Sequence, residues 1–329
     1  MRKITIFALA AFAFSSAFAN AVVSDYTNPR DRKFSPEEIQ KTKDAAPKKL
    51  LRKPAKTRNI LVFSKTEGYR HCDGIPAFKE LLKAMGENFK GSWKLTFTED
   101  PAMFEPETLK KFDCVILNNP TGRFFSEEKK AREQMSEDER KANEDLNKRC
   151  LENLLQYVEN GGGIMGMHAA CDAQGGSKYV EMMGGLFAGH PWGAGNAPVT
   201  VLVEDPNNIL LRGLWKDKEF QIRDEIYTFQ DKSFSRDAQR VLMSLDLERS
   251  PVDGGVDPMT RTGRKSKDFG LAWVKTYGKG RIFYGAFGHR HDVYFLNPEL
   301  CEFYCRGIQY ATGDIKPEVK PLGELKAKK

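Results

Sequence analysis

A regular alternation of short apolar runs with amphipathic segments is the feature that most constrains the fold of this chain. Apolar runs of strand length occupy residues 59–63, 93–98, 112–117 and 164–167. Apolar side chains at helical spacing occupy residues 75–85, 151–158 and 178–183. Strands that alternate with helices form a mainly parallel sheet with right-handed crossovers. The sequence therefore predicts an α/β fold built on a parallel central sheet.

After residue 196 the pattern changes to successive strands. These occupy residues 199–203, 219–222, 240–245, 271–276 and 281–286, and a helix over residues 299–312 closes the chain. Residues 126–149 are dense in Glu, Lys and Arg, which predicts a solvated extension of the helix that becomes amphipathic at 151–158. With no internal repeat and no break in composition, we expect one domain over residues 58–315, with the C-terminal strands added to the central sheet.

The first 19 residues have the pattern of a secretory signal peptide. Arg2 and Lys3 precede an apolar run, and Ala17-Phe18-Ala19 matches a small-x-small cleavage site. The run is shorter than the roughly 20 residues that a membrane-spanning helix needs. The sequence therefore predicts cleavage near Ala19-Asn20, a periplasmic or secreted location, and no stable membrane insertion.

Basic flanks account for much of the net charge of +7. Residues 20–57 are rich in Lys, Pro and Asp and predict an extended leader, and residues 316–329 form a basic tail. No stripe of aromatic and basic side chains is present on which bases could stack, which argues against a nucleic-acid partner. The six cysteines show no disulfide framework and no CxxC pair, which argues against a structural zinc site made of thiolates.

The five histidines are concentrated in loops. His71, His168 and His289 each follow a strand of the predicted sheet, His291 shares a loop with His289, and His190 lies beside Pro191. The carboxyl ends of parallel strands meet at one edge, where ligands bind in open α/β sheets. Histidine is suited to proton transfer near neutral pH and is the commonest metal ligand. We therefore expect the five histidines to converge on one site, with His71, His168 and His289 as its main residues.

One acidic pair accompanies the histidines. Asp224 and Glu225 end the strand that begins at residue 219, and adjacent side chains of a strand point to opposite faces. At most one of them should enter the site, and a solvated strand end is the alternative. Histidines with a carboxylate could hold a divalent metal such as zinc, although no HExxH helix is present. Asp73 is expected to cap the helix over residues 75–85.

Five segments together resemble the ThuA-like family, which is named for trehalose utilisation. The segments, which span residues 58–313, are Phe63-x4-Gly68-Tyr-Arg-His71, Gly161-Gly-Gly-x2-Gly166-Met-His168-Ala, Gly184-Gly-x-Phe187-x2-His190, Asp224-Glu225-x-Tyr227 and Trp273-x4-Gly278-Lys-Gly-Arg-Ile-Phe-Tyr284-x3-Gly288-His289. The resemblance implies a flavodoxin-like, class I glutamine amidotransferase-like fold. In true amidotransferases the strand-to-helix elbow carries a catalytic Cys. His168 stands at that elbow here, which argues against glutamine amidotransfer.

The resemblance also implies a carbohydrate substrate, since the family is associated with sugar metabolism and with dehydrogenases that make 3-keto sugars. Our first hypothesis is an exported enzyme that acts on a 3-keto-glycoside as a hydrolase, lyase or isomerase. Its expected catalytic residues are His168, His71, Glu225 and His289, with or without a divalent metal bound by the three histidines. The expected substrate-binding residues are Tyr69, Arg70, His190, Asp224, Tyr227 and His291.

Two alternatives remain at this stage. A non-catalytic sugar-binding module would use the same cleft, with Trp192 and Trp273 available for stacking on sugar rings. A thiol-based enzyme would use Cys171 or Cys72, both near the expected site edge. The sequence leaves homo-oligomerisation open.

Overall fold

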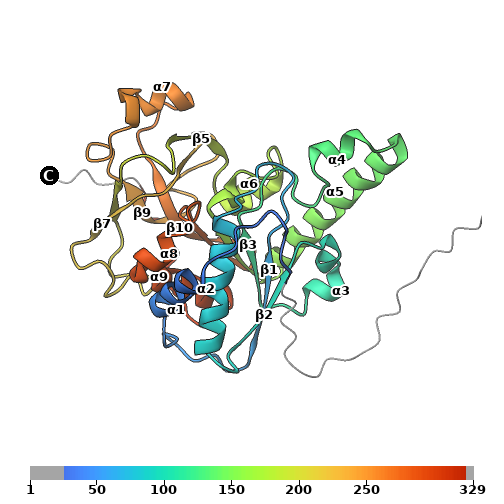
Figure 1. Cartoon of the computed structure of the whole chain (residues 1–329), viewed down its shortest axis with the longest axis horizontal. Helices are drawn as coiled ribbons and strands as arrows, with labels where there is room; N and C mark the ends of the chain where they lie inside the picture. The colour runs from blue at the N-terminus through green and yellow to red at the C-terminus, as the bar shows by residue number, and fades with distance from the viewer. Residues whose placement is uncertain (1–25, 324–329) are drawn as a thin grey trace, which may run out of the picture.

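A nine-stranded mixed sheet forms the centre of the protein (Figure 1). The structure is a computed structural model and describes residues 26–323. In spatial order the strands are β2 (Trp93–Thr98), β1 (Arg58–Phe63), β3 (Cys114–Asn118), β4 (Gly163–Met167), β11 (Gly280–Gly285), β10 (Gly270–Tyr277), β9 (Arg240–Leu245), β6 (Val199–Val203) and β7 (Glu219–Ile222). This order confirms the predicted mixed α/β architecture.

The first five strands of that order are parallel. β1 pairs in parallel with β2 and β3, β3 with β4, and β4 with β11. The strands β10, β9, β6 and β7 then continue the sheet by antiparallel pairing. Because β11 lies beside β4 with Gly285 opposite Met167, the loop after β11 and the loop after β4 leave the sheet at the same edge.

Helices cover both faces of the parallel strands, whose interior side chains are fully buried. One group of mutually packed helices is α1 (Pro36–Ala45), α2 (Gly74–Asn88), α8 (Val293–Leu296) and α9 (Pro298–Ala311). The other is α3 (Pro106–Leu109), α5 (Glu137–Glu159) and α6 (Lys178–Met183). Helix α4 (Lys129–Glu133) and the adjoining end of α5 project from the body (Figure 1).

A separate two-stranded ribbon pairs β5 (Phe187–Trp192) with β8 (Ile226–Phe229) in antiparallel fashion. The sequence analysis assigned no strand to either segment. Gly189 and Pro191 disrupt the strand pattern of β5, and the pairing itself contains two register shifts. This ribbon matters for function because it carries His190 and follows directly on Glu225.

The expectation of an extended leader over residues 20–57 is wrong for the part that the structure describes. Helix α1 begins with Pro36 and a capping box between Ser35 and Glu38, and it packs against α2 and α8. Its sequence is too polar to show an apolar stripe, which is why the pattern did not reveal it. The predicted signal peptide lies outside the described residues. Within residues 26–323, no helix is both long and apolar enough to cross a bilayer.

Two local expectations also need correction. The charged helix is interrupted, because α4 ends at Glu133 and a second capping box, at Ser136 and Glu139, starts α5. Asp73 precedes α2 but makes no side-chain capping bond. Its carboxylate instead lies 3.8 Å from Arg32 and 3.5 Å from His291.

The close approach of β4 to the end of α9 yields a stability prediction. A Cβ atom on Gly163 would lie 1.8 Å from the carbonyl oxygen of Ala311. We expect Gly163→Ala to destabilise the fold by about 1–3 kcal/mol or more, because backbone has to move to make room. The control Gly195→Ala, whose Cβ would have no neighbour within 4 Å, should change stability by less than about 0.5 kcal/mol. Chemical denaturation checks both, and equal effects would contradict the packing described here.

Candidate metal centre

Four side chains from distant parts of the sequence converge at the carboxyl edge of the parallel strands. His71 lies in the loop after β1, and His168 follows β4 directly, at the start of the short helix η2 (His168–Cys171). His289 lies in the loop after β11, and Glu225 precedes β8. One nitrogen from each histidine and one oxygen of Glu225 all lie within 4.8 Å of one another. The expectation that these three histidines meet at one edge is confirmed.

The distances within this His/Glu cluster are those of a metal site. Glu225 Oε2 lies 3.0 Å from His289 Nδ1, 3.3 Å from His168 Nε2 and 3.9 Å from His71 Nε2. Two ligand atoms bound tetrahedrally to a zinc ion at about 2.1 Å are about 3.4 Å apart. Three imidazole nitrogens and one carboxylate oxygen are also donors that zinc accepts. The residues present therefore fit a divalent metal.

His168 is held in one orientation by the backbone around it. Its Nδ1 lies 2.7 Å from the carbonyl oxygen of Ala286, so this nitrogen carries the proton and donates it. In the neutral ring Nε2 then presents its lone pair to the cluster. The backbone of His168 has a positive φ of 40°, which makes the turn from β4 into η2 sharp. Tyr284 fixes that turn by donating its hydroxyl to the His168 carbonyl oxygen, 2.7 Å away.

Burial and mutual contact change the protonation of the groups in this cluster. Burial lowers the pKa of His71 to about 3, so this ring is neutral at physiological pH. Burial disfavours the charged form of Glu225, but the facing histidines outweigh it and hold the pKa of this carboxyl well below its usual range. His168 Nε2 and His289 Nδ1 are buried without a hydrogen-bond partner among the described residues. A cation bound between these atoms would satisfy the lone pairs and the carboxylate together.

The adjacent acids Asp224 and Glu225 have different roles, as their opposite orientation predicted. Glu225 enters the cluster, whereas Asp224 is buried below the loop after β11. Asp224 accepts backbone N–H bonds from Gly288 at 2.6 Å and from Arg290 at 2.9 Å. Its oxygens position the loop that carries His289, and the expected substrate-binding role of Asp224 stays a prediction.

Three of the expected substrate-binding residues border the cluster. His190 Nδ1 lies 3.3 Å from Glu225 Oε1, and the side chain is 45% exposed. The Tyr227 hydroxyl lies 3.4 Å from His71 Nε2 and is buried. Tyr69 is 66% exposed, and its ring is nearly parallel to that of His289 with centroids 6.3 Å apart. His190 and Tyr69 are therefore the two that a molecule approaching from solvent can reach.

The other two expected substrate-binding residues are used within the protein. Arg70 is buried and paired with Asp31 and Glu99 at 2.8 Å each. The His291 ring lies 3.6 Å from Glu38 and stacks on Phe34. Part of the polar surface of both side chains faces the N-terminal segment, whose folding the sequence did not reveal, and their role in substrate binding stays a prediction.

The structure also bears on the two alternative hypotheses. Trp192 and Trp273 are fully buried and donate their indole N–H groups to backbone carbonyls, so neither can stack on a sugar. Burial raises the pKa of the Cys171 thiol well above its usual range, which makes it a poor nucleophile. All six cysteines are free thiols. The sequence analysis missed one contributor to the site, the backbone carbonyl of Ala286 that orients His168, because a pattern of side chains carries no signal for a backbone group.

Fold and site together define a flavodoxin-like α/β protein with a buried His/Glu cluster at the carboxyl edge of its sheet. The family model of ThuA, described as trehalose utilisation, matches residues 59–311. The chain therefore belongs to the ThuA family.

Comparison with solved structures agrees with this assignment. A ThuA-like protein of Bacteroides uniformis ATCC 8492 is 18% identical, with 78% of this chain and 93% of that one covered and a TM-score of 0.56. A ThuA-like protein of Parabacteroides merdae ATCC 43184 is 14% identical, with 82% and 93% covered and a TM-score of 0.50. At these identities the likeness extends to the fold alone. No curated protein matches the chain.

The protonation of the cluster predicts how zinc affinity depends on pH. Burial lowers the pKa of His289, but the Glu225 carboxylate, 3.0 Å away, outweighs it and raises this pKa above the usual value. Zinc has to displace that proton, so affinity should fall as pH falls from 8 to 6. His71, with a pKa of about 3, should contribute nothing to the change in this range. Titration against a chromogenic chelator calibrated at each pH measures the effect, and affinity that is constant over the range would contradict it.

Proposed function

We propose that this protein is an exported, metal-dependent enzyme that acts on a carbohydrate carrying a keto group, with a 3-keto-glycoside as the substrate to test first. The observation that carries the proposal is the convergence of His71, His168, His289 and Glu225 on one point at the ligand-binding edge of the sheet. Membership of a family described as trehalose utilisation supports a sugar as substrate.

The three histidines and Glu225 would hold the metal, with zinc the best match to their donor atoms. A bound divalent metal supplies a Lewis acid that polarises the keto group of the sugar. A carbonyl group acidifies the C–H bond on the neighbouring carbon. The reaction class that fits such a site is proton abstraction next to a carbonyl, followed by elimination, hydrolysis or isomerisation.

His190 is our candidate for the base that takes this proton. Histidines that bind a metal cannot also accept a proton on the same nitrogen, which leaves His190 as the histidine beside the cluster but outside the ligand set. Its Nδ1 lies 3.3 Å from Glu225 Oε1, a position in which the carboxylate would favour a proton on Nδ1 and leave the lone pair on Nε2. The proton would move from carbon to His190 Nε2, the electron pair of the C–H bond would form a carbon–carbon double bond, and the π pair of the carbonyl group would move to its oxygen.

Tyr69 is our candidate for the group that positions the sugar ring. It is an exposed aromatic side chain beside His289 and has both an apolar face and a hydroxyl. The same residue would also serve a sugar-binding module without chemistry, which is the second candidate function. Turnover distinguishes the two: a binding module holds the sugar unchanged.

The catalytic proposal predicts distinct losses in two variants. On a 3-keto-glycoside, His190→Ala should lower kcat by about 100-fold or more while zinc stays bound, because only the base is lost. Glu225→Gln should lose both zinc and activity, because the charged ligand is lost. The control Glu107→Gln changes an exposed acid that pairs with Lys110 and should behave as wild type. Tight sugar binding without turnover in the wild-type protein would favour the binding module.

Export gives a separate prediction. Mass spectrometry of the protein recovered from the periplasm or the medium should find an N-terminus at Asn20, because Ala17-Phe18-Ala19 matches the cleavage pattern. Full-length protein retained in the cytoplasm would contradict export while leaving the proposed chemistry intact.

A further inference from the structure

The His71 ring lacks the anchor that holds His168. Metal-binding histidines usually donate their second ring N–H to a carbonyl or carboxylate, which sets the direction of the ring. His168 does so through Ala286. His71 Nδ1 is buried without a hydrogen-bond partner among the described residues, and the Tyr227 hydroxyl contacts only Nε2. The direction of the His71 ring therefore depends on how firmly its backbone is held.

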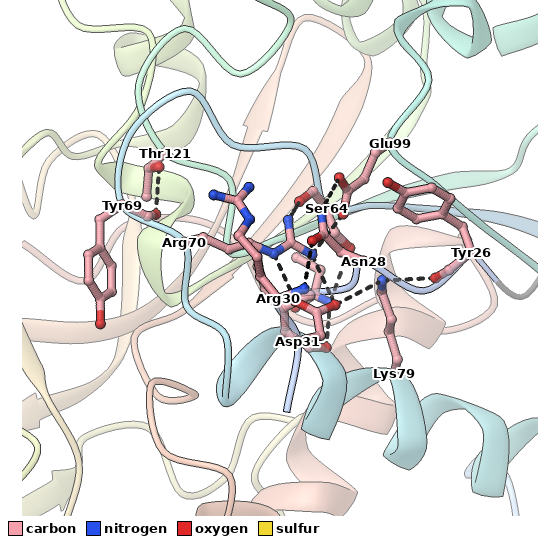
Figure 2. A network of polar contacts seen from close by, with 12 residues as sticks. Tyr26, Asn28, Arg30, Asp31, Ser64, Tyr69, Arg70, Lys79, Glu99 and Thr121 are labelled. Atoms are coloured by element: carbon pink, nitrogen blue, oxygen red, sulfur yellow. Dashed lines mark hydrogen bonds and ion pairs between the residues drawn. The ribbon is translucent and has the colours of Figure 1, made fainter. Parts of the chain in front are cut away.

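The residues on both sides of His71 are held by the N-terminal segment. The Arg70 guanidinium makes a two-pronged contact with Asp31, with Nε to Oδ1 at 2.8 Å and Nη2 to Oδ2 at 2.9 Å. Both side chains are almost fully buried, and Glu99 completes the network (Figure 2). On the other side of His71, the Cys72 carbonyl oxygen accepts the backbone N–H of Arg32 at 2.9 Å.

The same N-terminal segment also contacts the loop that carries His289. Glu38 in α1 and Phe34, which lies just before α1, both contact the His291 ring. The start of α2, which follows the His71 loop directly, packs against the His289 loop, since a Cβ on Gly74 would lie 2.0 Å from the carbonyl oxygen of Gly288. Residues 26–45 therefore lie across the junction between both loops.

We propose that residues 26–45 form a strap that positions His71 and His289 for metal binding, with Asp31 and Glu38 as its positioning residues. The inference rests on the proposed metal centre. Neither acid is within the His/Glu cluster, so each acts through the loop that it holds: Asp31 through Arg70, and Glu38 through His291. The strap lies N-terminal to residues 59–311, which the family model matches.

The main test compares Asp31→Asn with Asp113→Asn in the full mature chain. Asp113 is a matched control because it is also largely buried and also pairs with an arginine, Arg58, but it lies before β3 at the opposite edge of the sheet. We expect Asp31→Asn to raise the Kd for zinc by about 10-fold or more. Amide hydrogen exchange should also become faster in the loop over residues 67–73. Asp113→Asn should leave the Kd for zinc and the rate of exchange in this loop within twofold of wild type, even if it lowers thermal stability.

A milder pair of variants keeps the proposal testable if Asp31→Asn does not fold. Glu38→Gln removes one of the two carboxylates that contact His291, the other being Asp73, whereas Glu37→Gln removes a neighbouring charge on α1 that pairs with Lys41 on the same helix. We expect weaker zinc binding and faster exchange over residues 288–292 in Glu38→Gln alone.

The proposed strap would be overturned if a variant and its control changed zinc affinity and hydrogen exchange equally. It would also be overturned if neither Asp31→Asn nor Glu38→Gln changed them. If the wild-type protein binds no zinc, the proposed metal centre fails instead. Hydrogen exchange then decides on the strap by itself: unchanged exchange in both histidine loops of the folded variants would overturn it, and faster exchange confined to those loops would support it.

Discussion

The interaction on which the rest of the site depends is the contact of one buried carboxylate with three imidazole rings. Glu225 Oε2 lies within 3.9 Å of a nitrogen of His71, His168 and His289, in surroundings that keep His71 neutral. Such an arrangement is costly without a cation or a shared proton. The neighbouring structure holds these groups in place. Glu225 directly precedes β8 of the two-stranded ribbon. Asp224 accepts hydrogen bonds from the backbone N–H groups of Gly288 and His289 and so fixes the loop that carries His289.

The sequence predicted those features that follow from periodicity and from the rules of sheets. Alternating apolar runs indicated the parallel strands, and because β1, β4 and β11 run the same way, His71, His168 and His289 were expected at one edge. Only Glu225 of the acidic pair enters the cluster, as expected, although both acids lie between β7 and β8 and not at the end of a strand. Where periodicity is absent, prediction failed. Gly189 and Pro191 concealed β5, and the polar composition of α1 concealed the helix that takes up His291.

His168 illustrates why fold and chemistry have to be argued separately. It stands at the sharp turn between β4 and η2, the position that the resemblance assigns to a nucleophilic Cys in amidotransferases, and it keeps a positive φ of 40°. A thiolate there would attack an amide carbonyl, whereas an imidazole with Nδ1 bonded to a backbone carbonyl presents a lone pair suited to a metal. The same backbone can therefore support different reactions, and the side chains at the carboxyl edge of the sheet determine which reaction takes place.

Elemental analysis tests the central claim most directly. The mature protein would be purified without chelator and without a metal-affinity tag, beside His168→Ala, with circular dichroism to verify that the variant is folded. The account predicts a stoichiometric divalent metal in the wild-type protein and its loss in the variant, because His168 offers a buried, pre-oriented nitrogen. No metal in the wild-type protein, or equal metal in both proteins, would contradict the account.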